Sequence, residues 1–150
     1  MNLKCALLLS CDPRHRANCS NLGLLVLRVG IGVCFMLHGW PKISGGTGTW
    51  EWLGNTMPLT LGLPPVFWGF IAAFAEFGGG LLLTLGLFTR LAAVLMAITM
   101  AVAFNMHRAK GDNFDTFSHA LESFFVFAAL TQLGAGAWSL DAWLFGDRDA

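Results

Sequence analysis

Apolar residues fall into four long runs along the chain, over residues 22–40, 65–88, 91–106 and 121–138. Each run contains at most one fully charged residue. As an α-helix, the 19 residues of the first run would span roughly 28 Å, close to the thickness of the hydrocarbon core of a bilayer. The pattern therefore predicts four membrane-spanning helices.

Two features predict where these helices begin and how they connect. Pro64 and Pro65 suit the first turn of the second helix, because proline lacks the N–H group that this turn leaves unpaired. The connection between the second and third runs, LGLFTR (residues 85–90), is short. We therefore expect the second and third helices to be antiparallel neighbours.

Composition separates a membrane protein from a soluble helical one. The chain is 55% hydrophobic and 12% charged, and its mean hydropathy is +0.62. Soluble helices need a polar outer face, and the segment LMAITMAVAF (residues 95–104) has none. We therefore predict an all-α integral membrane four-helix bundle in contact with the lipid bilayer. The net charge of zero gives no electrostatic basis for nucleic-acid binding.

Charges outside the runs predict domain limits and topology. We expect an N-terminal tail over residues 1–21, a membrane domain over 22–143 and a C-terminal tail over 144–150. The apolar stretch in the N-terminal tail is too short for a secretory signal, so the tail is interpreted as mobile or interfacial. The positive-inside rule favours two cytoplasmic termini. One side of the membrane would carry Lys4, Arg14, Arg16, Arg90 and Arg148, and the other Lys42, Arg108 and Lys110.

Glu76 lies at the centre of the second run, where a charged side chain costs about 2.5–3.5 kcal/mol on insertion scales. A small-residue face that includes Ala72 and Gly80 would turn Glu76 toward a neighbouring helix. Two interpretations stay open. Glu76 either carries protons and binds a quinone-like headgroup, or it joins helices by pairing with Arg28 or a backbone carbonyl. Arg28 is expected to form an ion pair or to extend toward the membrane surface.

The first run ends in HGWPK, residues 38–42. Trp40 and Pro41 are expected to mark the outer membrane boundary, where the helix loosens, and Lys42 to reach the lipid headgroups. His38, one turn deeper, is a site candidate.

The predicted topology also places polar residues in two groups. The outer group is His38, Lys42, His107, His119 and Glu122, and the inner group is Arg28, Arg90 and Asp141. The histidines lack the spacing of a metal site, and the four cysteines form neither a CxxC nor a zinc pattern.

At these residues the chain resembles the DoxX family of small four-helix bacterial membrane proteins. The resemblance covers about residues 22–143 and depends on LRVGIGVCFMLHGWPK (27–42), AEFGGGLLLTLGLFTR (75–90) and GAGAWSLDAW (134–143). It implies a bundle in the bacterial cytoplasmic (inner) membrane. It also links some members to quinone-dependent sulfur oxidation, as subunits of thiosulfate:quinone oxidoreductase, and others to oxidative-stress complexes. The matching positions are Arg28, His38, Lys42, Glu76, Arg90 and Asp141.

Two functional hypotheses follow. In the first, the chain is a subunit of, or accessory to, a quinone-linked oxidoreductase. Glu76 and His38 are then the catalytic candidates, and Arg28, His38, Lys42 and Glu76 the quinone-binding candidates. In the second, the chain is a non-catalytic interaction or assembly subunit that associates with other membrane proteins or with itself.

Overall fold

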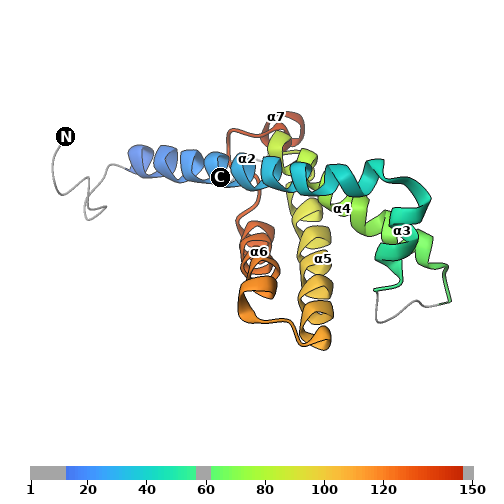
Figure 1. Cartoon of the computed structure of the whole chain (residues 1–150). Helices are drawn as coiled ribbons and strands as arrows, with labels where there is room; N and C mark the ends of the chain where they lie inside the picture. Colours follow the sequence, from blue (N-terminus) through green and yellow to red (C-terminus); the bar gives the residue numbers. More distant parts are fainter. Residues whose placement is uncertain (1–12, 57–61, 147–150) are drawn as a thin grey trace.

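The computed structural model describes residues 13–56 and 62–146, and within them all regular structure is helical. Figure 1 shows the arrangement of the helices. They are α2 (Pro13–Ser44), α3 (Gly46–Gly54), α4 (Pro65–Leu85), α5 (Thr89–Lys110), α6 (Phe114–Leu133) and α7 (Leu140–Phe145). The all-helical prediction is confirmed.

Three of these helices, α2, α4 and α5, are long and apolar enough to cross a membrane. They correspond to the first three predicted spans. Helix α6 overlaps the fourth predicted span but does not meet the same criteria, so the count of four spans stays a prediction. The cytoplasmic position of the termini also stays a prediction.

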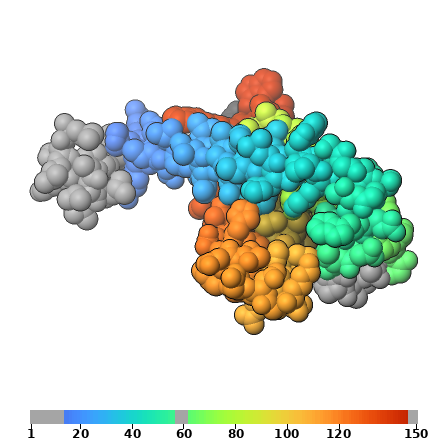
Figure 2. Space-filling model, in the orientation of Figure 1, coloured from blue at the N-terminus to red at the C-terminus, as the bar shows by residue number. Residues whose placement is uncertain are grey.

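Helix α2 is longer at both ends than the run that predicts it. It begins at Pro13, so residues 13–21, which the sequence assigned to a tail, are helical. It also continues through Pro41 to Ser44, so the predicted loosening at Trp40 and Pro41 is wrong. Figures 1 and 2 show the N-terminal part of α2 extending beyond the other helices.

Glycines bring α2 and α4 into backbone contact. A Cβ atom on Gly32 would lie 2.7 Å from the Gly80 carbonyl oxygen, and one on Gly39 would lie 2.5 Å from the Phe77 backbone nitrogen. Such close approach is possible only without side chains. The predicted small-residue face of α4 is therefore confirmed at Gly80.

Helix α3 packs against the N-terminal half of α4 and has no counterpart among the predicted segments. Gly54 and Gly69 leave no room for a Cβ beside the backbones of Pro65 and Trp50, respectively. The Trp50 indole also donates a 3.0 Å hydrogen bond to the Lys42 carbonyl oxygen. Helix α3 therefore lies along α4 and beside the end of α2.

The tight connection between α4 and α5 is formed as predicted. Gly86 ends α4 in the left-handed conformation, with φ of 67°, and α5 begins at Thr89. The two helices are neighbours in contact. In Figure 1, α5 and α6 run side by side and α2 crosses above them. The largest fully buried apolar side chains are Phe35, Leu83, Met96, Phe127 and Leu130.

Candidate functional site

An ion pair joins α2 to α4. The Lys42 ammonium lies 2.6 Å from Oε1 and 2.5 Å from Oε2 of Glu76. Glu76 is 4% exposed, whereas the Lys42 side chain is 34% exposed. Pairing of Glu76 with Arg28, and extension of Lys42 to the headgroups, are therefore both wrong. The depths of Lys42 and Glu76 in the bilayer stay a prediction.

Arg28 instead binds backbone carbonyl groups. It donates to Leu83 at 3.2 Å, to Thr84 at 2.9 Å, and to Trp138. The first two carbonyls belong to the last turn of α4, where a helix leaves its carbonyl groups unpaired and carries partial negative charge. The guanidinium is buried. Arg28 therefore fastens the end of α4 to the segment before α7.

The other two inner residues also lie near the α4–α5 connection. The Asp141 carboxylate accepts hydrogen bonds from the backbone N–H groups of Phe88 and Thr89, at 2.7 and 2.9 Å. Arg90 follows in the first turn of α5, and it lines a groove of about 380 Å³ together with Asp141. The predicted inner group therefore meets around this turn, but Arg28 and Asp141 bind backbone groups there.

Two adjoining cavities meet at the Lys42–Glu76 pair. The larger, of about 250 Å³, lies between α3, α4 and α5. Its other lining is mainly apolar: Trp52, Leu53, Ala72, Val102, Ala103 and Met106, with Thr56, Thr99, His107 and Lys110. The smaller cavity, of about 130 Å³, is lined by Lys42 and Glu76 together with His38, His107, Thr116 and His119 on α2, α5 and α6.

The smaller cavity gathers four of the five predicted outer residues. The His38 and His119 ring centroids lie 5.2 Å apart, and both side chains are exposed. The His119 ring also stacks on buried Phe35, with centroids 5.8 Å apart. Glu122 is exposed and does not line this cavity, so its predicted place in the group is wrong.

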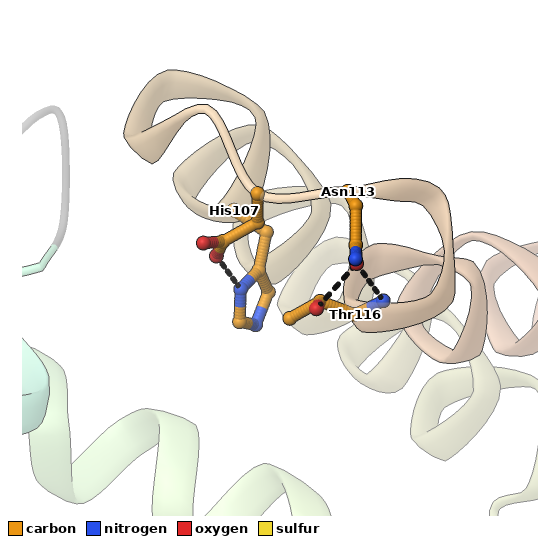
Figure 3. A network of polar contacts seen from close by, with 4 residues as sticks. His107, Asn113 and Thr116 are labelled. Carbon is orange, nitrogen blue, oxygen red and sulfur yellow. Dashed lines mark hydrogen bonds and ion pairs between the residues drawn. The ribbon is translucent and has the colours of Figure 1, made fainter.

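His107 lines both cavities and is held from the loop after α5. Its Nδ1 atom lies 2.7 Å from Asp112 Oδ2. The same loop positions α6, because the Asn113 side chain accepts hydrogen bonds from the backbone N–H and the hydroxyl of Thr116. Figure 3 shows these contacts. The contact with Asp112 holds His107, which lines both cavities together with the ion pair. Within the described residues, no three His, Cys, Asp or Glu side chains are placed to hold a metal ion.

The sequence did not single out the apolar wall of the larger cavity. Trp52 and Leu53 belong to α3, which no predicted segment covers. Helix α3 lines the cavity because its glycines allow close packing on α4.

Comparison with known proteins decides the family. The DoxX sequence profile matches residues 23–109. The chain belongs to the DoxX family. The inner membrane protein YqjF of Escherichia coli is 34% identical over 127 residues, which cover 81% of this chain and 91% of that protein. No solved structure matches the chain.

Two further relatives extend the comparison. The inner membrane protein YphA of Escherichia coli is 32% identical to this DoxX protein, over 79% of this chain and 87% of YphA. A Bacillus subtilis protein, the putative oxidoreductase CatD, is 39% identical over 53% of this chain and 54% of CatD. With its three candidate spans, this DoxX protein is a multi-pass inner-membrane protein in contact with lipid.

Proposed function

We propose that this DoxX protein is the quinone-binding membrane subunit of, or accessory to, an oxidoreductase. The observation that carries this proposal is the position of the Lys42–Glu76 pair in the wall of both an apolar and a histidine-lined cavity. Ligand sites combine apolar walls with a few convergent polar groups in this way. The name of the partial relative CatD supports the oxidoreductase association.

The two cavities fit the chemistry of a quinone headgroup. The ring is flat and apolar, and its two carbonyl oxygens accept hydrogen bonds. The larger cavity, of about 250 Å³, is lined by Trp52, Leu53 and Met106, which can pack against the ring. This volume is just below the roughly 300–1,000 Å³ typical of ligand pockets, so the cavity suits a headgroup whose lipid tail stays in the membrane.

The paired charges supply the polar part of the site. Lys42, which lines both cavities, is placed to donate a hydrogen bond to a quinone carbonyl oxygen. His38 lines the smaller cavity beside it. Glu76 holds or releases a proton on a carboxylate that is nearly inaccessible to water. Reduction of a quinone consumes two electrons and two protons. The electrons come from the oxidoreductase partner, and this chain contributes the proton site.

Quinone content tests the proposal. The protein is purified in native lipid nanodiscs, and quinone is extracted and quantified per mole of protein. We expect Glu76→Gln to lower quinone occupancy, with an affinity roughly 10 to 100 times weaker, because it removes a charged group worth about 1.5–3 kcal/mol in hydrogen bonding. Glu122→Gln is the matched control, since Glu122 is an exposed carboxyl group outside both cavities.

Equal quinone in the wild type and Glu76→Gln, or none in the wild type, contradicts the proposal. In that case cross-linking in membranes tests the alternative hypothesis. A non-catalytic assembly subunit cross-links to another membrane protein, and its deletion prevents assembly of that partner.

A further inference from the structure

The ion pair divides the site into an apolar side and an imidazole side. Lys42, Glu76, Ala103 and His107 line both cavities. His38 and His119 line only the smaller cavity, and no histidine other than His107 lines the larger one. A proton on Glu76 therefore has imidazole groups on one side and a mainly apolar wall on the other.

His38 and His119 line this cavity and also reach the surface of the protein. Both are exposed, whereas Glu76 is 4% exposed. Their rings come from different helices, α2 and α6, and their centroids are 5.2 Å apart. The buried Phe35 side chain supports both rings, with centroids 6.0 Å from His38 and 5.8 Å from His119. The pair is thus held at the opening of the cavity that contains Glu76.

We propose that His38 and His119 form the proton route between Glu76 and the exterior. An imidazole is suited to this role because one ring nitrogen donates a proton while the other accepts one. In the transfer to Glu76, an N–H bond of an imidazolium breaks and an O–H bond forms on the carboxylate. The neutral imidazole is then protonated again by a hydronium ion, which becomes water. The step needs no oxidant or reductant.

The inference rests on the proposed function for its purpose, because quinone reduction requires protons at this pair. The charged and titratable groups that face Glu76 in these cavities are Lys42 and His38 on α2, His107 and Lys110 on α5, and His119 on α6. Helix α3 adds none. Lys110 lines only the larger cavity, Lys42 is paired with Glu76 itself, and His107 is paired with Asp112. His38 and His119 are therefore the pair assigned to proton exchange.

The test follows protonation of Glu76 without a quinone. The protein is purified, and any bound quinone is removed by extraction. It is then adsorbed on the internal-reflection crystal of an infrared spectrometer, and the pH is lowered rapidly. The Glu76 carboxyl band is identified by its absence in Glu76→Gln. We expect protonation to slow roughly tenfold in the double variant His38→Gln/His119→Gln, which corresponds to about 1.4 kcal/mol of added barrier. Added imidazole should restore the rate in a concentration-dependent manner.

Controls separate proton transfer from a structural effect. His15→Gln removes an exposed histidine near the start of α2, far in sequence from the cavity, and should leave the rate unchanged. Lys42→Met, which removes the ion pair, is measured in the same way, and there too the histidine substitutions should slow protonation of Glu76. Thermal unfolding in detergent identifies variants that have lost their fold, and single histidine variants then replace the double one.

An unchanged rate in the histidine variants, or a slow rate that imidazole does not restore, overturns the inference. Either result is independent of whether quinone binds. The proposed function fails separately, when the wild-type protein contains no quinone or Glu76→Gln does not change its quinone content.

Discussion

Asp141 caps a helix that begins 52 positions earlier in the chain. Its Oδ2 atom accepts a 2.9 Å hydrogen bond from the Thr89 backbone N–H, while Oδ1 accepts one of 2.7 Å from Phe88. Phe88 has φ of 47°, in the left-handed region that non-glycine residues rarely adopt, and its own side chain provides no cap. Asp141 therefore does for α5 what an N-cap residue normally does locally.

Loss of this cap should destabilise the protein without touching either cavity. We expect Asp141→Asn to lower the free energy of unfolding by about 1–2 kcal/mol. The amide has one oxygen to accept a hydrogen bond, and its NH2 group cannot accept one, so one of the two backbone N–H groups loses its partner. Thermal unfolding in detergent measures the effect. Glu51→Gln removes an exposed carboxylate from α3 and serves as the control. A melting temperature unchanged from wild type would mean that the cap contributes little.

The Lys42–Glu76 pair should show strong energetic coupling. Glu76→Gln leaves the ammonium without its partner, and we expect a loss of about 2–3 kcal/mol. This is below the roughly 3–5 kcal/mol of fully buried pairs because Lys42 is 34% exposed. The double variant Lys42→Met/Glu76→Leu should lie within about 1 kcal/mol of the wild type, since neither side chain is then charged.

A double-mutant cycle made of Lys42→Met, Glu76→Leu and their double variant, followed by thermal unfolding, measures this coupling. Additive losses in the two single variants would contradict a direct interaction. Quinone content measured in parallel should fall in both single variants and in the double variant, so that stability and binding are separated.

Much of the fold could be predicted because a helix that crosses a bilayer needs about 20 mostly apolar residues in a row. Three apolar runs became α2, α4 and α5, and Pro65 stands in the first turn of α4 as expected. The inward orientation of Glu76 was also readable, since Gly80 on the same face contacts α2. These features depend on local sequence and on helical periodicity.

The partners of the charged residues could not be predicted in the same way. Sequence placed Lys42 at a membrane boundary and Glu76 at the midplane, yet they are bonded. The register between α2 and α4 decides this pairing, and it depends on backbone contacts at Gly32 and Gly39. Helix α3 was missed for a similar reason, because its sequence, GTGTWEWLG, has weak helix propensity and its packing on α4 stabilises it.

Arg28 should be sensitive even to a conservative change. Its guanidinium uses two nitrogens to reach three carbonyl groups, on Leu83, Thr84 and Trp138. A lysine ammonium cannot match the separation of the two guanidinium nitrogens, so Arg28→Lys leaves at least one of these carbonyl groups without its partner, and we expect a loss of about 2 kcal/mol or more. Arg16→Lys, at an exposed position of α2, is the control for thermal unfolding. Equal stability of the two variants would show that the carbonyl contacts are dispensable.

Two glycines of α2 should respond in opposite ways to the same substitution. Gly39 faces the α4 backbone, where a Cβ would lie 2.5 Å from the Phe77 nitrogen, whereas a Cβ on Gly30 meets nothing within 4 Å. Gly39→Ala must separate the helices, and we expect a loss of about 1–3 kcal/mol, as in overpacked cores. Gly30→Ala should be neutral or stabilising by up to about 1 kcal/mol, because alanine favours helix more than glycine does.

The Gly39 substitution also reaches the site, because Gly39 precedes Lys42 by three positions on the same helix. Separation of α2 from α4 should lengthen the Lys42–Glu76 contact and reduce quinone content, while Gly30→Ala leaves both unchanged. Thermal unfolding and quinone extraction on the same preparations check the two effects. If Gly39→Ala matches Gly30→Ala in both measurements, the close approach of α2 and α4 does not set the geometry of the ion pair.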